Sequence, residues 1–325
     1  MKTLQIMKTK RMFAYAAFLS AVLMTTACSK EQAGGPEPGE ALPVRFEVPG
    51  IEQTVGATKA AEALTDGTTV RIAAFYKSAS NPSPANLCKE VTYCLRDGKL
   101  VPCLVDENGA FTEFGGQDME LLPFVYDFYA VSPALPLGDD KGTVNVPQGV
   151  DFATSVTADR IISGEKVQTL TLTTLNRRCA KVTFEVKRAD DFAAMTALSV
   201  KKLTVGGLPE NAANVAIDGT IPAAEGSNTY EIPAEAFTAS DATTASATTF
   251  LLPTTGAGRI TFDYELDNTI DGTSSTSPLN GSVASLKLEA GKSYTVTLTV
   301  KKQGGTVIIT GWDSNNQSTD AGEWI

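Results

Sequence analysis

The feature that most constrains the fold is a series of short runs in which apolar and polar residues alternate, with turn-forming residues between them. Residues 69–76 are one example, because Val70, Ile72 and Ala74 would share one face of an extended strand. Similar runs recur to the end of the chain. We expect strands over residues 43–48, 69–76, 91–95, 100–104, 126–131, 170–174, 180–187, 198–205, 249–252, 259–266, 283–288, 294–300 and 306–310.

Helical periodicity is scarce by comparison. Residues 190–197 are the one short helix that the pattern favours, and so little helix would not cover the two faces of a parallel sheet. The chain is therefore predicted to be all-β, with two tandem antiparallel β-sandwich domains of transthyretin-like or immunoglobulin-like type. The loop-rich stretch 151–166 ends one set of strands, so we place the domains at 43–176 and 177–325.

The N-terminus has the features of a lipoprotein signal. Lys2, Lys8, Lys10 and Arg11 precede an apolar run over residues 12–24, which is too short for a permanent membrane span. The run stops at Cys28, so residues 1–27 would be removed and Cys28 would carry a covalent lipid that holds the protein on a membrane. The alternative is an ordinary secretory signal, which also places the mature chain outside the cytoplasm. Residues 28–42 are polar and rich in Gly, Pro and Glu, as in a flexible tether.

The composition disfavours several classes of function. The net charge is -10 and no basic cluster follows Arg11, which argues against a nucleic-acid partner. The absence of histidine removes most hydrolytic triads and the usual zinc sites, and we expect neither a metal nor another cofactor besides the lipid on Cys28. An enzyme would need a carboxylate pair, and Asp106-Glu107 and Asp139-Asp140 lie in predicted turns, where the sequence cannot pair them. We therefore expect no enzymatic activity.

The cysteines after Cys28 match no metal-binding spacing. They are Cys88, Cys94, Cys103 and Cys179. Cys94 and Cys103 flank a predicted hairpin turn at Asp97-Gly98, and a two-residue turn would place Cys94 opposite Val101. A disulfide between Cys94 and Cys103 would then need a shifted or longer loop. Buried thiols are the preferred interpretation, with the disulfide as the alternative.

Several local patterns, taken in order, resemble the fimbrillin family of Bacteroidales, the type V pilins made from lipoprotein precursors. They are the signal ending at Cys28, residues 44–48 followed by Thr58-Lys59-Ala60, residues 126–133, residues 180–184, residues 288–298, and Ile309-Thr310-Gly311-Trp312. The resemblance covers the chain from end to end. There is one departure, because many members have a histidine just before the Ala-Lys-Val element at 180–182, and here Arg177 stands about there.

The resemblance implies proteolytic maturation. A protease would cut in the loop after the first strand, after Lys59 and before Ala60, or alternatively after Arg45. The segment 43–59 would leave, and the N-terminal sandwich would be left with an open groove. We expect residues 50–67 to be a loop without regular structure, which would expose Lys59 to the protease. The alternative is that Lys59 is only a solvated loop residue.

The resemblance also implies that a C-terminal strand of the next subunit fills this groove by adding to a sheet edge. The candidate donor is the tail 306–325, because both tryptophans of the chain lie in it and a loose tail would expose them to water. Its apolar anchors are Val307, Ile308, Ile309, Trp312, Trp324 and Ile325. The alternative is that the tail docks on its own C-terminal sandwich.

The function implied by this resemblance is that of a structural subunit of a cell-surface fimbria, which supports adhesion. Its partners would be other fimbrial subunits, in a homopolymer or with accessory subunits, and the outer membrane through the lipid. The alternatives are a fimbrial tip or anchor subunit, or a monomeric surface lipoprotein that binds a host glycan or a host protein. No nucleic-acid partner is expected.

Overall fold

The computed structural model of the 325-residue chain describes residues 40–55, 58–163, 167–302, 305–310 and 317–321. These residues form 24 strands and one short 3₁₀ helix, η1 (Ala234–Ala236), so the all-β prediction is confirmed. The signal 1–27, Cys28 and most of the predicted tether lie outside the described residues. Among the described residues, no helix has the length and apolarity needed to span a bilayer.

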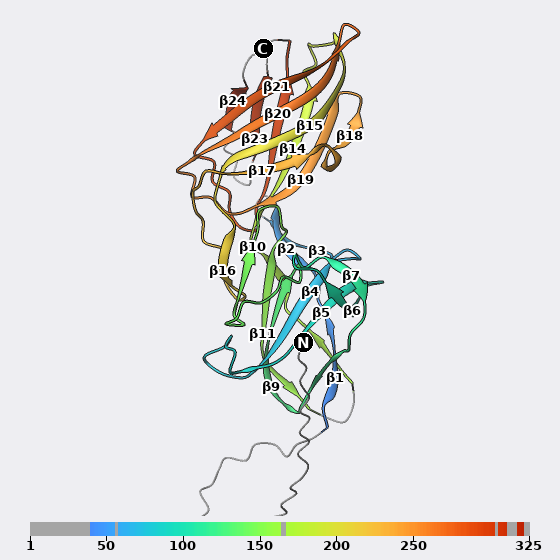
Figure 1. Ribbon diagram of the computed structural model, residues 1–325, viewed down its shortest axis with the longest axis vertical. Helices are drawn as coiled ribbons and strands as arrows, with labels where there is room; N and C mark the ends of the chain where they lie inside the picture. The colour runs from blue at the N-terminus through green and yellow to red at the C-terminus, as the bar shows by residue number, and fades with distance from the viewer. Residues whose placement is uncertain (1–39, 56–57, 164–166, 303–304, 311–316, 322–325) are drawn as a thin grey trace, which may run out of the picture. The chain divides into compact units, whose positions relative to one another are not determined.

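Two sheets are built from strands that precede Arg178 (Figure 1). The first has nine strands in the order β3 (Thr58–Glu62), β2 (Ile51–Val55), β13 (Leu175–Arg177), β11 (Ala153–Ile162), β9 (Phe124–Ser132), β4 (Thr69–Tyr76), β5 (Leu87–Arg96), β6 (Lys99–Val105) and β7 (Phe111–Phe114). The second has three strands in the order β12 (Gln168–Thr171), β1 (Leu42–Glu47) and β8 (Met119–Leu121). Their apolar faces share one core, in which Val44 and Met119 of the small sheet join Ile72 and Phe128 of the large one.

Two further sheets follow in the C-terminal half. One has six strands in the order β18 (Thr238–Asp241), β19 (Thr244–Leu251), β14 (Ala180–Arg188), β22 (Ser293–Val300), β23 (Gly305–Thr310) and β24 (Gln317–Ala321). The other has four strands in the order β17 (Asn228–Pro233), β15 (Met195–Leu208), β20 (Arg259–Ile270) and β21 (Thr273–Ala284). Alternation explains this packing, since in β14 Val182, Phe184 and Val186 are buried whereas the residues between them are partly exposed.

A small two-stranded sheet pairs β10 (Thr143–Val146) with β16 (Ala212–Ala216), across the predicted boundary at residue 176. A third apolar cluster likewise combines Phe75 and Phe152 with Ile217 and Leu252. The division into domains 43–176 and 177–325 stays a prediction.

Most predicted strands agree with the structure, and two predicted elements are wrong. Residues 190–197 form no helix, because Phe192 N–H bonds to Ala189 O and Met195 N–H bonds to Phe192 O as two successive turns before β15 begins. The burial of Phe192 and Met195, three residues apart, imitates helical spacing. The predicted strand 283–288 is also wrong, since β21 ends at Ala284 and Ser285 has a φ of 61°.

Not all pairing is antiparallel. β14 pairs with β22 in parallel, and so do β1 with β12 and β13 with β2. The other pairs of neighbouring strands are antiparallel among the described residues, as expected for the predicted sandwiches. Alternation within one strand carries no information on the direction of its neighbour, which is why the sequence did not reveal these three pairs.

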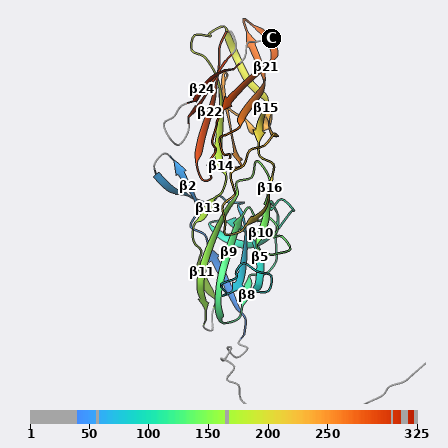
Figure 2. The ribbon, with the colours of Figure 1, turned by 90° about the vertical axis from the view of Figure 1, so that its left-hand side faces the viewer.

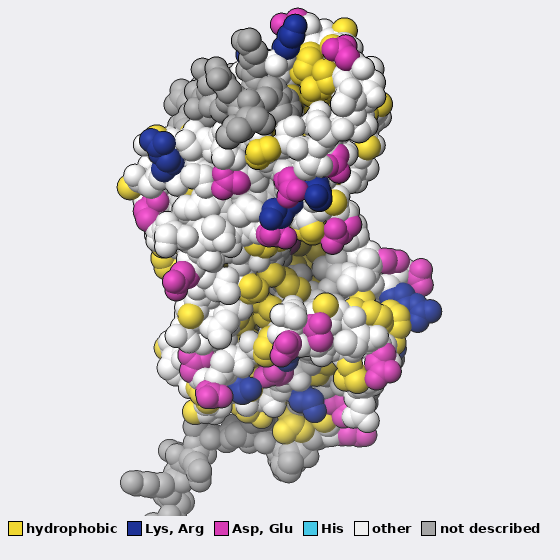
Figure 3. Space-filling model, turned by 45° about the horizontal axis from the view of Figure 1, so that its top comes forward, with side chains coloured by type: hydrophobic (Ala, Val, Ile, Leu, Met, Phe, Trp, Pro, Cys, Tyr) yellow, Lys and Arg dark blue, Asp and Glu magenta, His cyan; other side chains and the backbone are white. Residues whose placement is uncertain are grey.

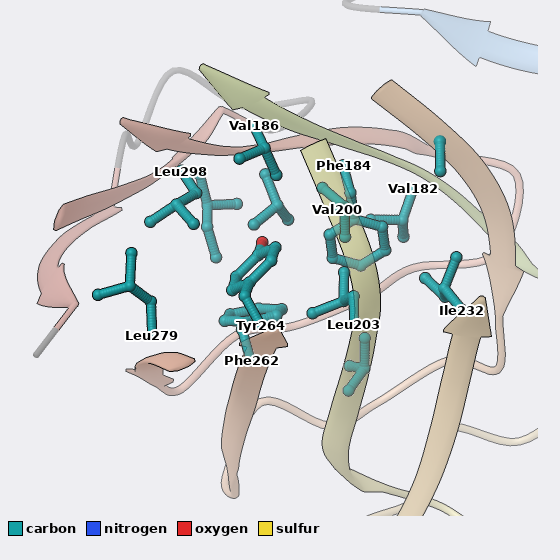
Figure 4. Close-up of a cluster of buried hydrophobic side chains, with 14 of the residues drawn as sticks. Val182, Phe184, Val186, Val200, Leu203, Ile232, Phe262, Tyr264, Leu279 and Leu298 are labelled. Atoms are coloured by element: carbon teal, nitrogen blue, oxygen red, sulfur yellow. The ribbon is translucent and has the colours of Figure 1, made fainter. Parts of the chain in front are cut away.

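The core between the two C-terminal sheets contains a tyrosine hydroxyl without a hydrogen-bond partner. Tyr264 is 2% exposed, and Figure 4 shows its oxygen among the carbon atoms of neighbouring apolar side chains. Burial raises the pKa of this phenol above its ordinary value. An unpaired polar group in such a place costs free energy of folding.

Tyr264→Phe is expected to stabilise the protein by about 1 kcal/mol, because it removes the unpaired hydroxyl without changing the ring. Thermal unfolding followed by calorimetry measures the effect. Tyr93→Phe is the matched control, since the Tyr93 hydroxyl accepts a hydrogen bond of 3.1 Å from Met119 N–H and its loss should lower the melting temperature. Equal shifts in the two variants would contradict the expectation.

Candidate functional site

The first strand, β1, is hydrogen-bonded along both of its edges. Val44 pairs with Gln168 of β12 in parallel and with Met119 of β8 in antiparallel orientation. β8 and β12 are not neighbours in any sheet of the described residues. If β1 were removed, both would keep unpaired backbone groups facing a gap the width of one strand.

The inward side chains of β1 fill the core beneath this gap. Val44 is 0% and Phe46 4% exposed. The Phe46 ring meets the rings of Tyr93 and Phe128 edge-on, at centroid distances of 5.6 and 5.5 Å. Burial of each such side chain contributes about 1.5–3 kcal/mol, so β1 is a structural part of the folded chain.

β1 and β2 together act as one long strand. Val44 pairs with Gln168, Glu47 with Thr171 and Ile51 with Leu175, and in each pair the partner lies 124 positions later. Between the two strands the parallel contacts continue, since Leu172 N–H bonds to Glu47 O (2.8 Å) and Leu175 N–H bonds to Gly50 O (3.0 Å). The pairing therefore crosses without a change of register from the three-stranded to the nine-stranded sheet.

Glycine permits this crossing. Gly50 has a φ of 146°, which a residue with a side chain rarely adopts, and it lies between β1 and β2. After this bend Ile51 is 7% exposed and packs in the same core as Val44 and Phe46. The segment 42–52 thus pairs first with β12 and then with β13. Figure 2 shows β2 beside β13.

The prediction that residues 50–67 form an unstructured loop is wrong. Strands β2 and β3 instead pair with each other in antiparallel orientation as the β2–β3 hairpin, and β3 is an edge strand of the nine-stranded sheet. Lys59 and Ala60 lie in β3, where their backbones pair with Thr54 and Gln53. These residues have little apolar alternation, and they form strands because β13 offers an edge to which β2 adds.

Glu62, at the end of this hairpin, is anchored to the rest of the chain. Its carboxylate accepts hydrogen bonds from Arg177 Nη2 and Lys181 Nζ, both at 3.2 Å. The Arg177 side chain is 3% exposed and also binds Asp151 through two bonds, of 2.6 and 2.8 Å. Burial acts to raise the pKa of Glu62, but the bond from Lys181 and the charges of Lys181 and Arg177 outweigh it, so the pKa lies below its usual value.

The C-terminal tail completes its own sheet as far as the structure describes it. β23 contains Val307 and Ile308 and pairs with β22, and Ile309 is 2% exposed in the C-terminal core. β24 then pairs with β23. Trp312, Trp324 and Ile325 lie outside the described residues. Arg45, the alternative cleavage site, is exposed on the outer face of β1, within a strand that is paired on both sides.

The remaining candidate groups have structural roles in the described part of the chain. Asp106 accepts hydrogen bonds from the N–H groups of Asn108 and Ala110, and Asp140 accepts them from Gly142 and Thr143, so both carboxylates stabilise turns. No cluster of metal-ligating side chains occurs among the described residues. Acidic and basic side chains are interspersed on the face shown in Figure 3.

The cysteines of the described chain are free thiols. Cys94, Cys103 and Cys179 are buried, and Cys88 is partly buried. Cys94 lies opposite Val101 across the two-residue turn, as predicted. Burial raises the pKa of Cys103 to about 11, so this thiol stays protonated and unreactive at neutral pH.

Fold and groove define a class of protein: an all-β chain whose first strand is inserted between two strands of its own body. The chain belongs to the fimbrillin-like family, whose model matches residues 41–320. No curated protein matches it. This membership supports a fimbrial or adhesive role at the cell surface and a structural rather than catalytic protein.

Two solved structures are similar to this chain to different degrees. A candidate cell adhesion protein from Bacteroides fragilis NCTC 9343 is 20% identical, with a TM-score of 0.65 over 85% of this chain and 99% of that one. A fimbrial assembly protein from Parabacteroides distasonis ATCC 8503 is 12% identical, with a TM-score of 0.43 over 86% of this chain and 99% of that one. Only the first likeness is high enough to support the fold.

Phe46→Ala is expected to destabilise the protein by about 3–5 kcal/mol, because the substitution leaves a cavity between Tyr93 and Phe128. Denaturant unfolding measures the change. Arg45→Ala, next to it on the exposed face, should shift the free energy of unfolding by no more than about 0.5 kcal/mol. Similar effects of the two substitutions would show that the core does not depend on β1.

Glu62→Gln is expected to loosen the β2–β3 hairpin by about 0.5–1 kcal/mol, because it weakens the bonds to Arg177 and Lys181. Faster hydrogen exchange of the β3 amides would show this, with Glu113→Gln on the exposed strand β7 as the control. The lowered pKa of Glu62 stabilises the folded chain at neutral pH and loses this effect as the pH falls through it. The exchange rates of the β3 amides in the wild-type and Glu62→Gln proteins should therefore converge at acidic pH. A difference in these rates that grows at acidic pH would contradict the assignment.

Proposed function

We propose that this protein is a structural subunit of a cell-surface fimbria, made as a lipoprotein with the lipid on Cys28. The single observation that carries the proposal is the position of β1. It is the first strand of the described chain, it is buried between β8 and β12, and the protein continues as a folded body after it. A strand from another subunit can therefore take its place by pairing with the same two edges.

In this proposal a protease cuts after Lys59 and residues 43–59 leave. The site is the edge strand of a hairpin, so β3 must detach locally before a protease can bind it in extended form. β3 is short and has a free outer edge, which keeps the free energy of such local opening low. Removal of β1 and β2 then opens the whole groove along β12 and β13.

The donor in this proposal is the tail 306–325 of a neighbouring subunit. Val307 and Ile309 alternate in the same way as Val44 and Phe46, which suits a groove that buries every second side chain of the strand in it. In the free chain β23 pairs with β22, so donation requires that β23 and β24 first leave their own sheet. The tail would lose the burial of Ile309 in its own C-terminal core when it leaves. In the proposal, burial of the tail side chains in the acceptor groove offsets this loss.

A second candidate is a tip or anchor subunit, or a monomeric surface lipoprotein that binds a host glycan or protein. The observation that favours it is that β23 and β24 complete the C-terminal sheet of their own chain. A subunit of this kind would keep Cys28 and its lipid on the outer membrane and would donate no strand. The N-terminus of the surface protein therefore distinguishes the two candidates.

Lys59→Gln is expected to abolish maturation, so that the precursor accumulates and the ladder of polymers seen in mild detergent disappears. Arg45→Gln is the matched control and should leave both unchanged, because the proposed cut lies after Lys59. N-terminal sequencing of wild-type subunits from the ladder should give Ala60. A ladder whose subunits begin at Cys28 would overturn the maturation step.

A further inference from the structure

Exposed apolar side chains gather at the end of the N-terminal sheets where the described chain begins. The four residues are Leu122, Phe124, Ile161 and Val167, and each is at least 38% exposed. Ile161 is the most exposed of them, at 68%. Figure 1 shows the ends of β1 and β9 together in this region. We refer to the four residues as the entry patch, because the chain enters the folded body beside them.

Strand pairing places two members of the entry patch on either side of β1. Leu122 directly follows β8, whose last residue pairs with Leu42. Val167 directly precedes β12, whose first residue pairs with Val44. Leu42 is the first residue of β1, so both members lie beside the point at which the described chain joins the sheet.

The other two members lie at the adjoining ends of β9 and β11. Phe124 is the first residue of β9 and pairs with Ile162, the last residue of β11, next to Ile161. The Phe124 ring meets the ring of Tyr76 edge-on at a centroid distance of 5.2 Å, and Tyr76 is itself partly exposed. The ends of four strands thus expose apolar side chains in one region, as in surfaces that contact a partner or a membrane.

The position of the entry patch along the chain indicates what covers it. The described residues begin at Glu40, and Cys28, the proposed site of the lipid, lies twelve residues earlier in the sequence. Twelve residues span at most about 43 Å. A lipid on Cys28 therefore keeps the entry patch close to the bilayer, where a high local concentration makes even a weak apolar contact effective.

We propose that the entry patch of the lipid-bearing precursor lies in the interface of the bilayer, with Phe124 and Ile161 inserted among the lipid headgroups. The inference rests on the proposed function, because the lipid on Cys28 brings the patch to the membrane. Apolar burial drives the contact, since the net charge of -10 provides no attraction to anionic lipids. The chain then leads away from the membrane by up to about 30 Å between Leu42 and Ile51, so the β2–β3 hairpin stays accessible to a protease.

The test uses the full lipid-bearing chain in vesicles of phosphatidylcholine. Ile161→Cys is labelled with an environment-sensitive fluorophore, in a Cys88→Ser background because Cys88 is only partly buried and would also react. Binding of the patch to the bilayer should shift the emission to the blue, and lipids that carry a nitroxide should quench it. High salt should leave both effects unchanged, because the contact is apolar. Val167→Cys gives an independent second measurement from the other side of the patch.

Phe111→Cys is the matched control for the label. Phe111 is an exposed aromatic residue like Phe124, at the same 38%. It borders a cavity together with Ser132, the last residue of β9, and so lies at the opposite end of that strand from the entry patch. Its label should show neither the shift nor the quenching.

Other results would overturn the inference in distinguishable ways. If the labels at residues 161 and 111 are quenched alike, the body has no preferred orientation on the bilayer. If the chain stays on the vesicles and the label at residue 161 is not quenched, the lipid holds the protein without the patch, so the proposed function survives and the inference fails. If the chain carries no lipid on Cys28 and leaves the vesicles, the proposed lipoprotein fails and the inference fails with it. A blue shift without quenching that grows with the density of protein on the vesicles would show that a second copy covers the patch.

Discussion

The double pairing of β1 is the interaction on which the N-terminal sheets depend. β8 and β12 do not pair with each other, so the three-stranded sheet exists because β1 joins them. The same strand supplies Val44 and Phe46 to the core that this sheet shares with the nine-stranded one. This strand is thus necessary for the three-stranded sheet, and it is the first strand of the described chain. Those two properties make its replacement by an equivalent strand physically reasonable.

Arg177 links the β2–β3 hairpin to the rest of the molecule. It ends β13, on which β2 adds, and its guanidinium binds Asp151 and Glu62 while it lies near the face of Phe250. A buried guanidinium requires such partners, because an unpaired charge in the core would be strongly destabilising. Arg177 thus fixes the end of the β2–β3 hairpin together with Lys181, which also binds Glu62.

Alternation predicted those strands whose two faces meet different surroundings. Residues 180–187 were found within a residue because one face is buried and the other is partly exposed. Residues 69–76 were also found, although Ala73 and Phe75 are buried on the second face of β4 as well. The β2–β3 hairpin was missed because it depends on a neighbour far along the chain and not on its own apolar residues. The position of Lys59 in a strand was missed for the same reason. The parallel pairing that lines the groove could not be predicted, since no local pattern reveals a pairing between residues 124 positions apart.

The covalent connection between β1 and the rest of the protein determines which strand occupies the groove. As long as the chain is intact, β1 competes for the groove at an effective concentration of about millimolar, the value for a segment held by a short connection. In the proposed assembly, a donor strand from another subunit would be far more dilute and, with similar contacts, would lose this competition. If the connection is cut, β1 becomes a separate ligand that can dissociate. After it is diluted, its concentration is too low for it to rebind. Cleavage would then set the time and place of assembly without altering a single contact in the groove.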